Sequence, residues 1–421
     1  MAMVRHMRKL FNLPFYHLLF FLSILGPGLI SAIAGNDAGG ITTFSVAGAR
    51  FGYSLFWTMI PLILLLIIIQ EMCARMGVVT GKGLADLIRE NFGLKMTVTF
   101  MIGLFFANFA TTVSEFAGIA AASELFGLNR YVTVLFAAFI VLFLIIKINY
   151  KLLEKVFLFM CLFYVTYIIS GVLAHPDWRA VGHSILTPTF SLDVPYLVIL
   201  VGLLGTSITP WMQFYLQSSI VEKGLKLSEY RYARWELILA AILATSISFF
   251  ILLAAAATLY PQGITIENAA EAATALEPIA GHFAEVLFAL GLFAAALFGA
   301  FILPLSTAYY VCEAFGWESG VNKKVHEARE FYAVIGLLVV PSVIVVLIPS
   351  IPLVPLMLLA QVINGLLLPV LLLVILHLVN KEKVMGEYVN GNMYNAVCWI
   401  AAGLLILVTL IMAGMTVWQV V

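Results

Sequence analysis

The chain has 421 residues, of which 63% are hydrophobic and 10% are charged, and its mean hydropathy is +1.08. A soluble domain carries about 25% charged residues, so this composition excludes an ordinary soluble protein and indicates a polytopic membrane protein. The formal net charge of +0 provides no field that would attract nucleic acid. The four cysteines lack C-x-x-C spacing, which argues against a disulfide framework or a zinc site.

Apolar runs of spanning length recur along the whole chain. They predict spans at residues 18–50, 54–76, 97–123, 131–149, 153–174, 195–217, 231–258, 280–310, 331–349, 353–379 and 395–419. The first run follows basic residues, as in a signal peptide. It is long and has no small-residue cleavage pattern, so we expect it to be retained as the first span.

The basic residues predict the orientation of these spans. With the N-terminus inside, only Arg50, Arg130 and Arg179 of the 22 Lys and Arg residues fall in outside segments. This bias follows the positive-inside rule. We expect an integral protein of a prokaryotic cytoplasmic membrane, with a cytoplasmic N-terminus and an external C-terminus. The external segment 259–279 is acidic and predicts a small amphipathic helix from Glu267 to Leu276.

The first apolar run contains an acid and several glycines near its middle. Asp37 would cost about 2.5–3.5 kcal/mol at mid-bilayer. Gly35, Gly39 and Gly40 lower helix propensity by up to about 1 kcal/mol each relative to Ala. We therefore predict a helix that is interrupted over residues 35–40. Such a break is tolerated only where it lines a cavity or is buried in protein.

A second interruption is predicted in the sixth span, over residues 202–211. This stretch has two glycines, hydroxyl side chains and Pro210. Two broken spans, five spans apart, are the pattern of a transporter built from inverted repeats. Residues 18–174 and 195–379 would form the two repeats and residues 395–419 an added span, all in one membrane domain. The alternative for the sixth span is a proline kink inside a bundle.

The two breaks together predict an ion site made of oxygen atoms. Asp37 is the only acid in either break, and its alternative role is to cap the following half-helix. Thr206, Ser207 and Thr209 add hydroxyl groups, and unwound backbone frees carbonyl oxygens. Met212 is expected to pack rather than bind. A set of carboxylate, hydroxyl, carbonyl and water ligands suits Mg²⁺, Ca²⁺ or Mn²⁺.

Other polar side chains fall within the predicted spans. Glu71 is expected to pair with Arg75 one turn later. The remaining intramembrane candidates are Glu115, Glu236, Gln361 and Asn364. The two amides of the tenth span could reach the ion or its water shell. The alternative for all four is an interhelical hydrogen bond, worth roughly 0.6–2 kcal/mol.

The motif Gly26-Pro27-Gly28, followed by Asp37-Ala38-Gly39-Gly40, resembles the NRAMP family of divalent-metal transporters. The span count, the second break and the Gln361-bearing span fit the same resemblance, which covers nearly the whole chain. The resemblance implies an all-α, LeuT-type fold of two inverted five-helix repeats plus an eleventh span, with spans 1 and 6 interrupted. It also implies that the ion binds at the two breaks.

The chain departs from the family pattern at the site. Where the family has an Asn ligand there is Gly40, which we expect to leave room for the ion. Thr206 and Thr209 replace the family's Ala and Met ligands, and Trp211 replaces a His that is linked to proton movement. On the third span, Thr112 replaces an Asp and Glu115 is kept. These changes resemble the NRAMP-related magnesium transporters.

We therefore predict inward transport of partly hydrated Mg²⁺, with Mn²⁺ as a second substrate, by alternating access without obligatory proton coupling. The resemblance implies metal ligation by Asp37, Thr206 and Thr209, and a substrate site completed by Gly40, Gln361 and Asn364. The ion is cargo, and no resident cofactor, nucleic acid or obligate protein partner is expected besides the lipid bilayer. The alternatives are a proton-coupled Mn²⁺ or Fe²⁺ importer and a Na⁺-coupled organic-solute transporter. No catalytic motif predicts an enzyme.

Overall fold

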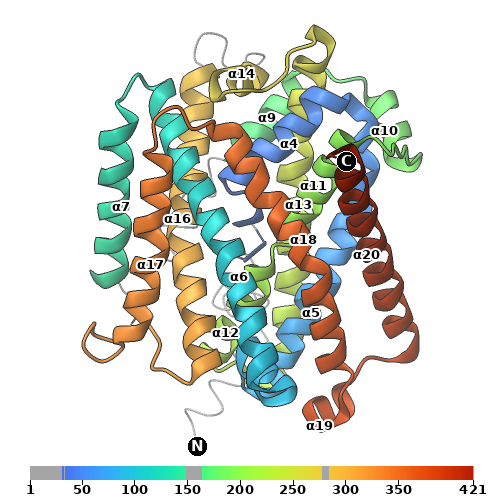
Figure 1. Ribbon diagram of the computed structural model, residues 1–421. Coiled ribbons are helices and arrows are strands. Elements are labelled where there is room, and N and C mark those ends of the chain that lie inside the picture. Colours follow the sequence, from blue (N-terminus) through green and yellow to red (C-terminus); the bar gives the residue numbers. More distant parts are fainter. Residues whose placement is uncertain (1–30, 33, 148–163, 277–283, 322, 421) are drawn as a thin grey trace, which may run out of the picture.

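The structure is a computed structural model, and it describes residues 31–32, 34–147, 164–276, 284–321 and 323–420. Every regular element in these ranges is a helix. Nine helical stretches of the described chain are long and apolar enough to cross a membrane. The helices stand side by side as one bundle (Figure 1). The prediction of an all-helical polytopic membrane protein is confirmed.

The described elements follow one another in two series. The first comprises η1 (Ala34–Asn36), α4 (Ala38–Phe51), η2 (Gly52–Thr58), α5 (Met59–Thr80), α6 (Leu84–Leu125), α7 (Arg130–Lys147), α9 (Val165–Leu173) and α10 (Trp178–Leu186). The second comprises α11 (Val194–Ser207), α12 (Pro210–Glu222), η4 (Leu227–Glu229), α13 (Tyr230–Thr258), η5 (Tyr260–Gln262), α14 (Ala269–Ala273), η6 (Thr274–Leu276), α16 (Ala284–Phe315), α17 (Arg329–Val346), α18 (Leu353–Val379), α19 (Glu382–Met385), η8 (Gly386–Tyr388) and α20 (Asn392–Val420).

The predicted spans match these helices except near some ends. The first half of the expected span 18–50 and the start of the span 153–174 lie outside the described residues. The expected span 54–76 begins late as an α-helix, because η2 follows a left-handed turn at Gly52 (φ +54°). The span expected at 97–123 is extended by an earlier segment from Leu84, which bends at Gly93 (φ +76°). The polar residues of this earlier segment lower its mean hydropathy, so hydropathy alone does not predict that the helix begins there.

The predicted helix from Glu267 to Leu276 is present in shorter form. The α-helical part is α14, and η6 continues it to Leu276. A capping box begins α14: Glu271 N donates to Asn268 Oδ1 at 3.0 Å, and the Glu271 carboxylate accepts from Asn268 N at 3.1 Å.

Glycines allow the central helices to approach closely around the two breaks. A Cβ at Gly205 of α11 would overlap the backbone of Gln361 in α18. A Cβ at Gly365 of α18 would in turn overlap the Val201 backbone of α11. Small residues at such crossings let backbones pack directly, as is common between membrane helices. The contact holds α18 against the helix that precedes the second break.

The two ends of the bundle differ in charge. One end, here named the basic end, carries the α5–α6 turn and α19, with Lys82, Arg89, Lys223, Lys381 and Lys383. It lies at the bottom of Figure 1, and α14 lies at the opposite end. Arg50, Arg130 and Arg179 belong to that opposite end. These basic residues therefore lie at the ends of the bundle that correspond to the predicted inside and outside segments.

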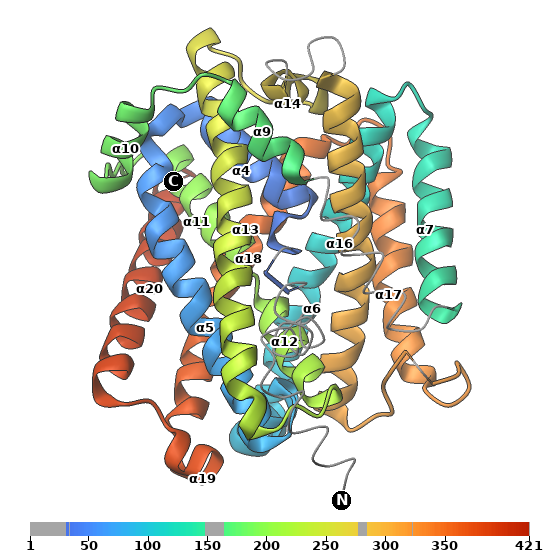
Figure 2. The same cartoon turned by 180° about the vertical axis from the view of Figure 1, so that it is seen from behind.

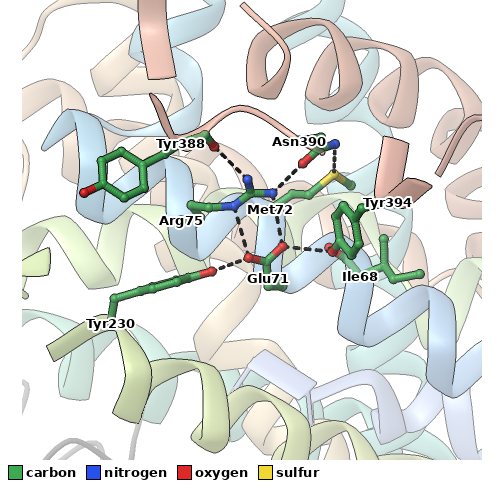
Figure 3. A network of polar contacts seen from close by, with 8 residues as sticks. All are labelled: Ile68, Glu71, Met72, Arg75, Tyr230, Tyr388, Asn390 and Tyr394. Atoms are coloured by element: carbon green, nitrogen blue, oxygen red, sulfur yellow. Dashed lines mark hydrogen bonds and ion pairs between the residues drawn. The ribbon is translucent and has the colours of Figure 1, made fainter. Parts of the chain in front are cut away.

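At the basic end, the expected Glu71–Arg75 pair is the centre of a larger polar network (Figure 3). Arg75 Nε lies 3.0 Å from Glu71 Oε1. The hydroxyl groups of Tyr230 and Tyr394 also donate to this carboxylate, the latter at 2.9 Å. We name these residues, with Asn390, the Glu71 network. It joins α5 to α13 and to α20.

Candidate ion-binding site

The first break ends at Asp37, which caps the helix that follows. Asp37 has extended backbone angles (φ −64°, ψ −175°), and its Oδ1 accepts from Gly40 N at 2.7 Å. The predicted interruption over residues 35–40 is therefore shorter than expected, because Gly39 and Gly40 already lie in the first turn of α4. The capping bond satisfies one free N–H group and fixes the carboxylate beside the break.

Two side chains from other helices reach the Asp37 region. Gln361 Nε2 of α18 donates to Asp37 Oδ1 at 3.3 Å. Glu115 of α6 accepts from Ala38 N at 3.2 Å, and its carboxyl group contacts that of Asp37. A Cβ at Gly299 of α16 would overlap the Glu115 carboxyl, so a glycine makes the space for it. Asp37 and Glu115 thus form a buried carboxyl pair.

The second break separates α11 from α12. Ile208 (φ −132°, ψ 56°) and Thr209 (φ −61°, ψ 136°) leave the helical conformation, and Pro210 begins α12. Proline suits this first helical position because the N–H group it lacks would have no intrahelical partner. The Thr209 hydroxyl donates to the Thr206 carbonyl at 3.4 Å. The proline therefore starts a new helix rather than kinking a continuous one.

A direct hydrogen bond joins the two breaks. Thr206 Oγ1 donates to the Gly35 carbonyl at 2.9 Å. A Cβ at Gly40 would overlap the same carbonyl and lie 2.8 Å from Thr206 Oγ1. In this conformation the Gly35 carbonyl and the Thr206 hydroxyl occupy the space beside Gly40, and the role of Gly40 at the ion stays a prediction. The absent side chain permits the two breaks to touch.

A chain of amides continues from Asp37 along α18. Asn364 Nδ2 donates to Gln361 Oε1 at 3.2 Å and to Thr111 Oγ1 of α6 at 2.9 Å. Gln361 and Asn364 are fully buried. Gln361 thus contacts the predicted acid directly, whereas Asn364 reaches it only through Gln361.

Of the remaining predicted polar residues, Ser207 lies near the first break, where a Cβ at Gly35 would sit 3.8 Å from its carbonyl oxygen. Ser207 is half-buried at the end of α11, and Glu236 is buried on α13. Trp211, at the position of the family's His, is fully buried, and its Nε1 has no hydrogen-bond partner in the part of the chain that is described. Thr112 donates to the Asn108 carbonyl at 2.7 Å within its own helix.

Sequence reasoning missed two residues at the first break. Asn36 Nδ2 donates to the Ala244 carbonyl at 3.1 Å, and Asn36 Oδ1 accepts from Ser248 at 2.7 Å, so the break is anchored to α13. Ser114 lies close to Gly39, where a Cβ would sit 2.9 Å from its Oγ. Asn36 could have been noticed as the neighbour of Asp37, whereas Ser114 gives no signal in the sequence.

The architecture is that of a membrane transporter with a LeuT-type fold: two inverted five-helix repeats, spans 1 and 6 broken, and an added span. A manganese transporter from Eremococcus coleocola superimposes with a TM-score of 0.76 at 22% identity, covering 93% of this chain and 86% of that chain. MhsT, solved in complex with L-phenylalanine, superimposes with a TM-score of 0.59 at 15% identity, covering 92% and 98%. These likenesses establish the fold.

Sequence comparison establishes the family. The family description "Natural resistance-associated macrophage protein-like" (Nramp) matches residues 28–414, and the chain belongs to this family. The divalent metal cation transporter MntH of Yersinia pestis (strain Pestoides F) is 32% identical over 285 residues, which are 66% of this chain and 69% of that protein. The MntH of Klebsiella pneumoniae is 28% identical over 387 residues, 90% of each.

Proposed function

We propose that this protein is a transporter that imports divalent metal ions by alternating access, with partly hydrated Mg²⁺ as the main substrate and Mn²⁺ as a second one. Membership of the Nramp family and the names of its MntH relatives support metal transport. Residues 18–174 and 195–379 would act as the two repeats, and residues 395–419 as the added span. The basic end would face the cytoplasm under the positive-inside rule.

The observation that carries the magnesium proposal is the oxygen chemistry at the two breaks. Asp37 would be the principal ligand, and the Thr206 carbonyl and Thr209 hydroxyl or carbonyl would complete the set. Gln361 and Asn364 would contact the water shell, and Gly40 would line the site. No three His, Cys, Asp or Glu side chains converge on one point in the described residues. Mg²⁺ usually keeps several waters and takes one or two carboxylates, which suits such a site.

Membrane potential would supply the driving force without protons. Trp211 and Thr112 stand where the resembled family has its proton-linked His and Asp, and neither side chain titrates near neutral pH. An inside-negative potential favours entry of a divalent ion by about 4.6 kcal/mol per 100 mV. Glu115 remains as a second acid, buried against Asp37.

Liposome flux measurements test this proposal. We expect uptake of Mg²⁺ and weaker uptake of Mn²⁺, without acidification of the lumen, and at least a ten-fold loss of uptake in Asp37→Asn, about 1.4 kcal/mol at the transport barrier. Asp177→Asn is the matched control, because Asp177 also caps a helix but is exposed and remote. Unchanged Mg²⁺ uptake in Asp37→Asn would refute the site.

One contact favours a second candidate, a transition-metal importer. The Met212 methyl group lies close to Gly35, where a Cβ would sit 2.8 Å from Cε. Met212 is fully buried. A thioether here could replace the one that is absent at Thr209, and thioethers select softer metals. Met212→Leu would then abolish Mn²⁺ uptake, whereas the magnesium proposal expects Mg²⁺ uptake within two-fold of wild type, roughly the effect of a volume-conserving swap.

A further inference from the structure

Helix α12 carries a polar stripe from the second break toward the basic end. Gln213 and Gln217 follow Thr209 at intervals of four residues, which places all three on one side of the helix. All residues from Pro210 to Ile220 are buried. In Figures 1 and 2, α12 extends from the centre of the bundle to its basic end. The stripe therefore begins at the proposed ion site and leads to one face of the molecule.

The two glutamines are incompletely hydrogen-bonded. Gln213 is fully buried, and neither Oε1 nor Nε2 has a hydrogen-bond partner among the described residues. Gln217 Nε2 donates to the Lys82 carbonyl at 2.9 Å, whereas its Oε1 has no such partner. Burying an amide without partners is unfavourable. A hydrated path that opens in another conformation would give these atoms hydrogen-bond partners.

An acidic group lies where the stripe ends. A Cβ at Gly83, next to Lys82, would overlap the carboxyl of Glu313, so Glu313 and Gln217 meet at the same turn. Two more acidic side chains, Asp86 and Glu222, lie near enough to interact electrostatically with the Glu313 carboxyl. Oε2 of Glu313 has no hydrogen-bond partner in the described part of the chain.

The nearby basic residues leave this carboxyl available. Arg89 Nη1 lies 3.4 Å from the main-chain carbonyls of Glu313 and Ala314, where it caps the end of α16. Lys82 pairs with Glu90 at 2.7 Å. No three acidic side chains of the described chain converge closely enough to chelate a metal. An ion here would be held through its waters, weakly enough to be released.

We propose that Gln213, Gln217 and Glu313 form the exit track along which a hydrated divalent cation leaves the site for the basic face. This inference rests on the proposed transport of divalent ions and adds its route. The amide oxygens of Gln213 and Gln217 would accept from the ion's water shell. The Glu313 carboxyl, whose Oε2 has no hydrogen-bond partner among the described residues, would contact the ion's water shell at the mouth.

Cysteine accessibility tests the route. Gln213→Cys is made in a background in which Cys73, Cys161, Cys312 and Cys398 are replaced by Ser and whose Mg²⁺ uptake is retained. A membrane-impermeant methanethiosulfonate reagent is then added to either face. Modification is expected from the basic face and to be slowed by Mg²⁺. Leu216→Cys, on the same buried helix but outside the stripe, is the matched control and should react at least ten-fold more slowly, as a fully buried core position.

The variant Gln213→Leu tests whether Gln213 serves the exit of the ion or only the packing of α12. Replacing a buried unpaired amide with an apolar side chain is expected to raise the unfolding temperature. Mg²⁺ uptake should nevertheless fall about five-fold in maximal rate, with little change in KM, as expected for the loss of one hydrogen bond at the barrier. Glu313→Gln should lower the maximal rate in the same way.

The outcomes distinguish the route from the transport proposal. If wild-type protein moves no divalent ion, the transport proposal fails. If it moves Mg²⁺ while Gln213→Cys is unreactive from both faces and Gln213→Leu transports at the full rate, the route is wrong and the transport proposal stands.

Discussion

Two side-chain oxygen atoms, Asp37 Oδ1 and Thr206 Oγ1, organise the contacts at the breaks. Asp37 Oδ1 accepts from both Gly40 N and Gln361 Nε2, so the acid is oriented from two directions. Thr206 Oγ1 donates to the Gly35 carbonyl and holds the second break against the first. A side chain at residue 40 would overlap that carbonyl. Gly40 and Thr206 therefore act as a pair.

Replacing the Thr206 hydroxyl tests this pairing. Thr206→Val keeps the shape and removes the donor, which leaves the buried Gly35 carbonyl without this bond and should cost about 1–3 kcal/mol. Thr206→Ser keeps the hydroxyl and should transport Mg²⁺ nearly as well as wild type. Uptake and unfolding temperature are measured together. Equal behaviour of the Val and Ser variants would show that the hydrogen bond has no role.

Single residues of the site differ in how far the sequence predicts them. Asp37 could be predicted because an acid in a glycine-rich apolar run is costly and therefore informative. The contact of Gly40 with Gly35 and Thr206 could not be predicted, because the fold brings these residues together. Ser114 was missed because a single hydroxyl on an apolar helix carries no signal until Gly39 is placed against it.

At the scale of elements, α20 is joined to the bundle by the Glu71 network. Arg75 donates to the Tyr388 carbonyl at 2.7 Å and to Asn390 Oδ1 at 2.5 Å, both just before α20. Glu71 accepts from Tyr230 at the start of α13 and from Tyr394 in α20. Leaving a buried charge unpaired costs several kcal/mol, so these elements are expected to stay together during transport.

The Glu71 network can be weakened one hydroxyl at a time. Tyr394→Phe removes the donor from α20 and should lower the free energy of unfolding by about 1.5–3 kcal/mol, as for a hydrogen bond to a charged group. Tyr388→Phe is the control, since Tyr388 contributes through its main-chain carbonyl. Thermal unfolding in detergent measures both. A Tyr394→Phe protein as stable as the Tyr388→Phe protein would contradict the structural role of this hydroxyl.

Helix existence was easier to predict than helix ends. The span predicted at residues 353–379 has the bounds of α18, because this run is apolar except at Gln361, Asn364 and His377. The start of α6 was missed because Asp86, Arg89 and Glu90 make its first turns polar, although these turns pack at the basic end. The Glu71–Arg75 pair was predicted from its spacing, but its partners on α13 and α20 were not, since they are distant in sequence.

At the scale of the whole molecule, the charge distribution and the site chemistry lead to one expectation about driving force. Basic residues gather at one end of the bundle, and the acids at the break, Asp37 and Glu115, are buried in its middle. An ion that binds there moves through part of the membrane field. Its inward passage is therefore favoured by an inside-negative potential, whatever the proton gradient.

Setting the potential and the proton gradient independently tests this expectation. A K⁺ gradient with valinomycin, inside negative, should accelerate Mg²⁺ uptake into liposomes at equal internal and external pH, and reversing the potential should slow it. An inward proton gradient at zero potential should leave the rate unchanged. Trp211 and Thr112 offer no titrating group, whereas the buried pair Asp37 and Glu115 at the first break could carry a coupled proton. Uptake that requires the proton gradient would contradict uncoupled transport.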